Sequence, residues 1–376
     1  MAVAAPGETA AGDHNAIYPP NGSRTVKKWI MAPLLAFALS PVHAQPLNVA
    51  NWNDYIDPAV LADFTRETGI EVNYRTYDSD QEVYALLKQG EALDVVVPST
   101  DNFGKLIREG LLRPYAAASL PGFEVLEPLI MARVAGHDPT HEYGVPYLWG
   151  SIGLAVNVPQ AEAALGGPVP NTWGLVFDKA LLARLSACGV SLLDSANDVT
   201  SLLANYQGRS LGTAGEAYVS RVLEQLGRLR PHYRYIDSSR YVDDLGSGKL
   251  CVSMAWTGDA LAAAAKGLPV KFMVPEEGSL VFVDILAIPA AAKNPEEAQA
   301  FIRYMLRPEV SARIARATYY QTPNARARQA LEAEGGSVQA ARLSADMFGY
   351  QAPREEVGKL IDDFWPRLLE NRVGGR

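Results

Sequence analysis

The sequence has little cysteine and histidine, and it lacks the common catalytic signatures. Only two of its 376 residues are cysteine and five are histidine. No H-E-x-x-H, G-x-S-x-G or phosphate-binding-loop motif is present, so metalloprotease, serine-hydrolase and nucleotide chemistry have no support. His137 and His141 have the i, i+4 spacing of helical metal ligands, but Pro139 between them favours a surface turn. We predict a protein that is not an enzyme and has no metal and no cofactor.

Positive charge and long apolar runs are also scarce. The chain has 34 Lys and Arg against 42 Asp and Glu, a net charge of -8. An acidic chain is a poor candidate for binding nucleic acid and a reasonable one for capturing cations, although solubility alone would explain the charge. No run approaches the length of a confident transmembrane helix.

The N-terminal region has the pattern of a secretory signal. Basic residues between positions 24 and 28 precede an apolar run at 29–39, which ends in Val42-His43-Ala44. We predict that residues 1–44 are a signal peptide with an N-terminal lead, cleaved after Ala44. A start codon assigned too far upstream would explain the lead. The mature chain from Gln45 is long enough for two lobes, and an exported chain favours a disulfide between Cys188 and Cys251 over a metal site or a nucleophile.

Short apolar runs alternate with amphipathic stretches, which predicts an α/β fold. We expect a βαβαβα unit at 46–115, an extended crossing between lobes at 146–150, and a mostly helical region at 160–235. The expected strands are 47–50, 70–74, 94–98, 152–156, 190–193, 251–256 and 281–289. The expected helices are 58–68, 80–89, 105–110, 241–245, one that opens at 294, and 354–369.

Aromatic and acidic residues collect at the ends of these strands. Trp52, Asp54 and Tyr55 follow the first strand, Trp256 precedes Asp259, and Phe282 lies beside Asp284. Ligands of open α/β sheets bind at the carboxyl ends of the strands. Aromatic faces attract an organic cation, and neighbouring carboxylates repel one another unless a cation lies between them. The pattern favours a cation site, with ordinary core packing of the rings as the alternative.

At these residues the chain resembles the periplasmic polyamine-binding proteins of ABC transporters, closest to the putrescine receptors. The resemblance extends from Leu47 to about Arg367 and includes six separated motifs in the family's order. They are Asn51-Trp52-Asn53-Asp54-Tyr55-Ile56, Asp94-Val95-Val96-Val97-Pro98-Ser99, Ser186-Ala187-Cys188-Gly189-Val190, Tyr235-Ile236-Asp237-Ser238-Ser239, Ala255-Trp256-Thr257-Gly258-Asp259 and Phe282-Val283-Asp284.

The resemblance implies the two-lobed periplasmic solute-binding protein fold of type II, with a hinge and an interlobe ligand cleft. We expect residues 46–148 and 285–320 to form the first lobe, and 149–284 and 321–376 the second. The cysteines match the family's disulfide positions. The family's function implies a periplasmic monomer that captures a polyamine, with putrescine preferred, and delivers it to permease subunits in the inner membrane.

The resemblance also implies a set of ligand-binding residues. Asp259 and Asp284 would grip one end of a diamine, and Asp54 and Asp198 the other, partly through water. The full set is Trp52, Asn53, Asp54, Tyr55, Ser99, Asp198, Ser238, Trp256, Asp259, Phe282, Asp284 and Tyr320.

Three departures from the family's pattern, and one match at Phe282, bear on ligand identity. Asn53 replaces a Ser, and Asp198 is one methylene shorter than the expected Glu. Asp101-Asn102 replaces a Ser-Phe pair, which adds a carboxylate. Phe282 favours a putrescine-type pocket over a spermidine-type pocket with Trp. Spermidine and related diamines therefore remain alternatives.

Two other functions remain open at this stage. Tyr319-Tyr320 would suit a ferric-ion receptor of the same fold, although two indoles in the cleft have no role as iron ligands. A polyamine-sensing protein without transport would share every feature of the site.

Overall fold

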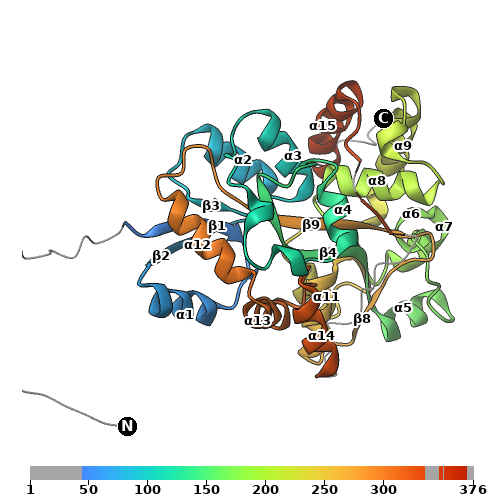
Figure 1. Ribbon diagram of the computed structural model, residues 1–376. Coiled ribbons are helices and arrows are strands. Elements are labelled where there is room, and N and C mark those ends of the chain that lie inside the picture. Colours follow the sequence, from blue (N-terminus) through green and yellow to red (C-terminus); the bar gives the residue numbers. More distant parts are fainter. Residues whose placement is uncertain (1–44, 335–346, 350, 371–376) are drawn as a thin grey trace, which may run out of the picture. The chain divides into compact units, whose positions relative to one another are not determined.

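The computed structural model describes residues 45–334, 347–349 and 351–370 (Figure 1). The predicted signal peptide at 1–44 lies outside these residues. Contacts group residues 44–376 into one unit. Within the described part of the chain, no helix is both long enough and apolar enough to cross a bilayer.

Ten described strands form one connected sheet. Their bounds are β1 (Leu47–Trp52), β2 (Val72–Tyr77), β3 (Val95–Val96), β4 (Gly144–Asn157), β5 (Val190–Leu192), β6 (Tyr235–Ile236), β7 (Val252–Trp256), β8 (Val270–Met273), β9 (Ser279–Ala287) and β10 (Met347–Gly349). The order is β2-β1-β3-β9-β4-β7-β5-β6, with β10 beside β9 and β8 beside β4.

Fifteen α-helices surround these strands in the described residues. Their bounds are α1 (Pro58–Thr68), α2 (Asp80–Lys88), α3 (Thr100–Arg108), α4 (Pro128–Val134), α5 (Val158–Leu165), α6 (Gly174–Phe177), α7 (Lys179–Leu185), α8 (Ala196–Tyr206), α9 (Glu216–Leu229), α10 (Tyr241–Gly246), α11 (Thr257–Ala265), α12 (Pro295–Met305), α13 (Pro308–Thr318), α14 (Ala325–Ala333) and α15 (Glu355–Leu369).

Side-chain alternation along the first strands builds two cores on opposite faces. In β1, Leu47 and Val49 pack with α1, α12 and α13 in a first core, whereas Ala50 packs with α2, α3 and α4 in a second core. The period of two in a strand produces this division. Figure 1 shows α1 and α12 on one side of β1 to β3, and α2 and α3 on the other.

Two element boundaries differ from the sequence prediction and move polar residues to the sheet edge. β2 ends at Tyr77 rather than at residue 74, because every residue of β1 from Leu47 to Trp52 pairs in parallel with one of β2. α3 begins at Thr100 rather than at residue 105, immediately after Ser99. Both changes place loop residues at the carboxyl ends of β2 and β3.

β4 is continuous, whereas the sequence predicted an extended crossing followed by a separate strand. All 14 residues are buried. Its first half, from Gly144 to Ser151, pairs antiparallel with β9. Its second half, from Ile152, pairs with β7 and β8. One fully buried strand therefore connects two groups of strands.

The second group of strands carries a third core, which includes residues of α5 to α10 and of α15. The predicted disulfide between Cys188 and Cys251 is formed. Two residues of α14, Ala327 and Leu331, pack in the first core instead. The lobe boundaries remain a prediction, and the cores favour placing α14 with the first lobe and α15 with the second.

Candidate functional site

The first centre of the site is the pair of Tyr55 and Asp284. Tyr55 follows β1, and Asp284 lies in the middle of β9. The Tyr55 hydroxyl donates a hydrogen bond to Asp284 Oδ2 at 2.5 Å. Tyr147 on β4 donates to the Tyr55 carbonyl at 2.8 Å, which fixes the turn. Burial holds the pKa of Asp284 well above its usual range, the bond from Tyr55 opposes this, and the charge of Asp80 adds to it.

The second centre is Asp259, in the first turn of α11. It accepts hydrogen bonds from Tyr241 at 2.5 Å and from Tyr320 at 3.1 Å. Burial raises the pKa of Asp259, the two phenol bonds lower it, and the negative charge of Asp54 raises it. Asp54 is exposed and lies in the left-handed backbone region with φ 52°. Asp54 and Asp259 are therefore close enough for their negative charges to repel each other.

Aromatic rings adjoin these two centres. Phe282 and Trp256 each pack against both the first and the third core, so they lie where the two cores meet. The ring of Tyr320 contacts that of Tyr55, with centroids 4.8 Å apart, and that of Phe282, with centroids 6.0 Å apart. Gly258 permits this packing, because a Cβ there would lie 2.2 Å from Tyr320 Cε2.

A third carboxylate, Asp80, lies at the edge formed by β2 and β3. It accepts hydrogen bonds from the Ser99 hydroxyl and from the Ser99 backbone N–H. The backbone of Ser99 in turn forms a bridge to Asp284 on β9. Thr100 ties α3 to the same strand, since its hydroxyl donates to the Val283 carbonyl at 2.6 Å. The start of α3 is thus fixed beside Asp284.

Two further carboxylates complete this group. Burial, followed by the charges of Asp198, Asp80 and Asp284, holds the pKa of Asp101 well above its usual range. The pKa of Asp198 is raised to about 6. Burial is the main cause, the charge of Asp80 adds to it, and the hydrogen bond that Ser195 donates at 2.6 Å opposes it. The charge of Asp80 on α2 therefore raises the pKa of carboxyls on α3, α8 and β9.

The remaining predicted residues contact other side chains or the backbone of the protein. Trp52 packs against Tyr77 with ring centroids 4.8 Å apart, and its indole nitrogen is buried with no hydrogen-bond partner among the described residues. The Asn53 side chain donates to Asp78 at the end of β2. Ser238 accepts the Asp194 backbone N–H at 2.9 Å. The hydroxyl of Ser238 is therefore engaged with the loop that follows β5.

Sequence reasoning missed Asp80, Tyr147 and Tyr241. In the sequence, Asp80 appears only as the start of a helix. With β2 extended to Tyr77, it becomes a polar residue that closely follows a strand end, where sites form. The two tyrosines carried no local signal, because only the tertiary structure brings their hydroxyls to Tyr55 and Asp259.

The arrangement can hold an elongated organic cation. The charge of Asp54 raises the pKa of Asp259. The charge of Asp80 raises the pKa of Asp101, Asp198 and Asp284. Two acidic groups, connected through the ring of Tyr320, match a molecule with a positive charge at each end and an apolar middle. Across the described ranges, no group of three His, Cys, Asp or Glu side chains is arranged to hold a metal ion.

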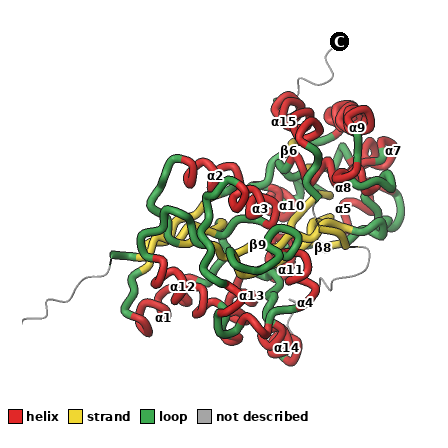
Figure 2. Tube along the Cα trace, turned by 45° about the horizontal axis from the view of Figure 1, so that its top comes forward, coloured by secondary structure: helices red, strands yellow, loops and turns green. Residues whose placement is uncertain are grey.

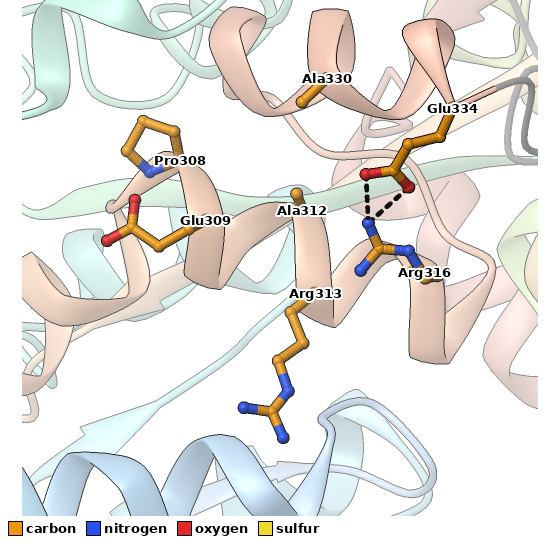
Figure 3. Close-up of a pocket in the computed structure, with 7 residues that line it drawn as sticks. All are labelled: Pro308, Glu309, Ala312, Arg313, Arg316, Ala330 and Glu334. Carbon is orange, nitrogen blue, oxygen red and sulfur yellow. Dashed lines mark hydrogen bonds and ion pairs between the residues drawn. The ribbon is translucent and has the colours of Figure 1, made fainter.

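A separate surface hollow lies between α13 and α14 (Figure 3). Its arginines are already paired: Arg316 binds Glu334 at 2.6 Å, and Arg313 binds Asp57 and Asp63 at 2.6 Å each. The hollow contains none of the predicted site residues.

Comparison with known proteins supports a family assignment. A family model described as bacterial extracellular solute-binding protein matches residues 59–341. The chain is 33% identical to the putrescine-binding periplasmic protein PotF of Escherichia coli strain K12 over 92% of this chain and 99% of that protein. It is 36% identical to the putrescine-binding periplasmic protein SpuD of Pseudomonas aeruginosa strain UCBPP-PA14 over 75% of this chain and 79% of that protein.

Solved structures agree with this assignment. The spermidine/putrescine ABC transporter substrate-binding protein PotD of Streptococcus pneumoniae matches with a TM-score of 0.73 and 27% identity. The match covers 88% of this chain and 100% of that one. The α/β fold predicted from the sequence, that of the periplasmic solute-binding proteins, is confirmed.

Proposed function

Because the chain belongs to the bacterial extracellular solute-binding protein family, whose members are receptors and not enzymes, we propose that it captures a polyamine and delivers it to an ABC importer. Putrescine is the ligand we favour. The relatives named as putrescine-binding proteins support a polyamine, and the site supports a ligand with at least two positive charges.

The observation that carries the proposal is the division of the site's carboxylates into two groups, around Asp259 and around Asp284. Taking an ammonium out of water costs several kcal/mol, which a cation–π contact of about 2 kcal/mol does not offset. A diamine therefore needs a carboxylate at both ends. Asp259 with Asp54 would bind one ammonium, and Asp284 with Asp198 the other. This pairing differs from the one that the resemblance implied, because Asp284 lies beside Ser99 and Asp80.

The rings suit the apolar middle of the ligand. Trp256 and Phe282 lie where the first and third cores meet, and Tyr320 packs edge-on against Phe282. In the proposed complex, these faces cover the methylenes and the carboxylates fix the spacing of the two amines. Phe282 favours putrescine, whereas the additional carboxylate of Asp101 would tolerate a third amine, so spermidine is the second ligand to test.

The proposal includes a compartment and a membrane partner. We propose that residues 1–44 direct the chain to the periplasm, where it acts as a monomer and docks on the permease subunits of the importer. Ligand binding would shift the population of closed receptor by contacts with both lobes. A sensing role without transport would share these steps and differ only in the partner.

Calorimetry with a panel of ligands tests the proposal. The mature protein is titrated with putrescine, cadaverine, spermidine, spermine, lysine and arginine at pH 7.5. We expect putrescine to bind most tightly and both amino acids to bind weakly, because their carboxylate would face an acidic site. A protein that binds none of the amines would refute the polyamine proposal, and a visible charge-transfer band with ferric iron would favour the iron receptor instead. Stimulation of the cognate ATPase would separate transport from sensing.

A further inference from the structure

Trp365 on α15 makes a polar contact that core packing does not explain. Its ring is 6% exposed and packs in the third core with Val357, Ile361 and Leu368, on the inner face of the helix. Its indole N–H donates to Asp194 Oδ1 at 2.7 Å, and Asp194 itself is exposed. The rigid indole therefore holds a carboxylate at the protein surface.

Asp194 belongs to the short loop that joins β5 to α8. The loop is held on one side by Ser238, which accepts the Asp194 backbone N–H at 2.9 Å, and on the other by Trp365. The next residue, Ser195, donates to Asp198 Oδ2 at 2.6 Å. A continuous set of contacts thus connects the C-terminal helix to a carboxylate of the proposed ligand site.

The helices that surround this loop are packed together. α15 contacts both α8 and α9, and Figure 2 shows α15 beside α9. Asp198 lies in the first turn of α8, where the orientation of the carboxylate depends on how the preceding loop is held. A side chain that is ordered before binding loses less entropy when the ligand arrives.

We propose that Trp365 is a positioning residue of the ligand site: by holding Asp194, it fixes the first turn of α8 and orients the Asp198 carboxylate toward the ligand. This inference rests on the proposed polyamine function and extends the site to the C-terminal helix. It also assigns Ser238 a positioning role, because its hydroxyl holds the same loop.

Substitutions that separate the indole N–H from the packing of the ring test the proposal. Trp365→Phe keeps an aromatic ring in the third core and removes the donor. We expect the Kd for putrescine to rise roughly fivefold, the effect of one hydrogen bond of ordinary strength. Asp194→Ala should have the same effect, whereas Asp194→Asn keeps an acceptor oxygen and should bind nearly as tightly as the wild type.

A double-mutant cycle tests whether Trp365 acts through Asp198. In an Asp198→Asn background, Trp365→Phe should change the Kd less than twofold, because the charge that it orients is already gone. Additive losses in the cycle would overturn the proposal.

Arg230→Met is the matched control. Arg230 donates to the Leu368 carbonyl at 2.9 Å, so this change removes another bond to α15 without touching Asp194. We expect no change in Kd. An equal loss in Arg230→Met, or wild-type affinity in Trp365→Phe with unchanged thermal unfolding, would overturn the inference. If the wild-type protein binds no amine, the proposed function itself fails, so the two failures are distinguishable.

Discussion

Asp259 should contribute more to ligand affinity than any ring of the site. The proposed ammonium lies against a carboxylate that two phenols already orient, from Tyr241 at 2.5 Å and Tyr320 at 3.1 Å. Asp259→Asn keeps the shape and one acceptor oxygen but removes the charge. The comparison is with Phe282→Ala, which removes a ring and leaves every carboxylate in place.

The expected losses of affinity differ, and the loss is larger for Asp259→Asn than for Phe282→Ala. Removing one partner of a buried ion pair costs about 3–5 kcal/mol, and about 1.4 kcal/mol corresponds to a tenfold change in Kd. Asp259→Asn should therefore weaken putrescine binding by roughly 100-fold or more. A cation–π contact contributes about 0.5–2 kcal/mol, so Phe282→Ala should weaken binding by roughly 2- to 30-fold.

Titration calorimetry at pH 7.5 and low salt measures both variants, and thermal unfolding of the ligand-free proteins is the control. Asp259→Asn should unfold at or above the wild-type temperature, because burial and Asp54 already raise the pKa of this carboxyl and make its charge unfavourable. Equal losses of affinity, or a larger loss in Phe282→Ala, would refute the assignment of Asp259 as the primary anchor.

Three further predictions concern pH, packing and the disulfide. Putrescine binding should weaken as the pH falls from 7.5 to 5, because Asp198, with a pKa of about 6, takes up a proton and no longer attracts an ammonium. The ligand-free protein should gain stability over the same range, since a raised folded-state pKa favours proton uptake by the folded form. Asp198→Asn should flatten the pH profiles of both putrescine affinity and stability. Profiles that stay as in the wild type would contradict the assignment. Gly258→Ala should lower the unfolding temperature and weaken binding, because its Cβ would lie 2.2 Å from Tyr320 Cε2; a variant with wild-type stability and affinity would show that Tyr320 can move freely. Reducing Cys188–Cys251, which closes a separation of 63 residues, should lower the free energy of unfolding by about 2–4 kcal/mol in a denaturant titration; identical curves with and without reductant would contradict this.

Much of the fold was predictable because its signals are local. The apolar run at 95–97 and the helix that starts at Pro58 each carry their own pattern, and the structure places β3 and α1 there. Boundaries were less predictable. Residues 75–77 of β2 look polar in sequence, and only their parallel pairing with β1 extends the strand.

The residues of the site also include some that the sequence predicts and some that it does not. Trp52, Asp54 and Tyr55 could be selected because they follow a strand directly, as could Trp256 with Asp259. Asp80 could not be selected, because an acid at the start of a helix is common and its meeting with Ser99 depends on how β2 and β3 are arranged.

The sequence by itself determined an acidic α/β chain whose strand ends carry aromatic and acidic residues, since strand and helix patterns and net charge need no tertiary information. The tertiary structure alone decided which carboxylates share an environment. The charge of Asp54 raises the pKa of Asp259, and the charge of Asp80 raises the pKa of Asp198 and of Asp284. The physical reason is that electrostatic repulsion and desolvation depend on distance and burial, and these follow from packing rather than from separation along the chain.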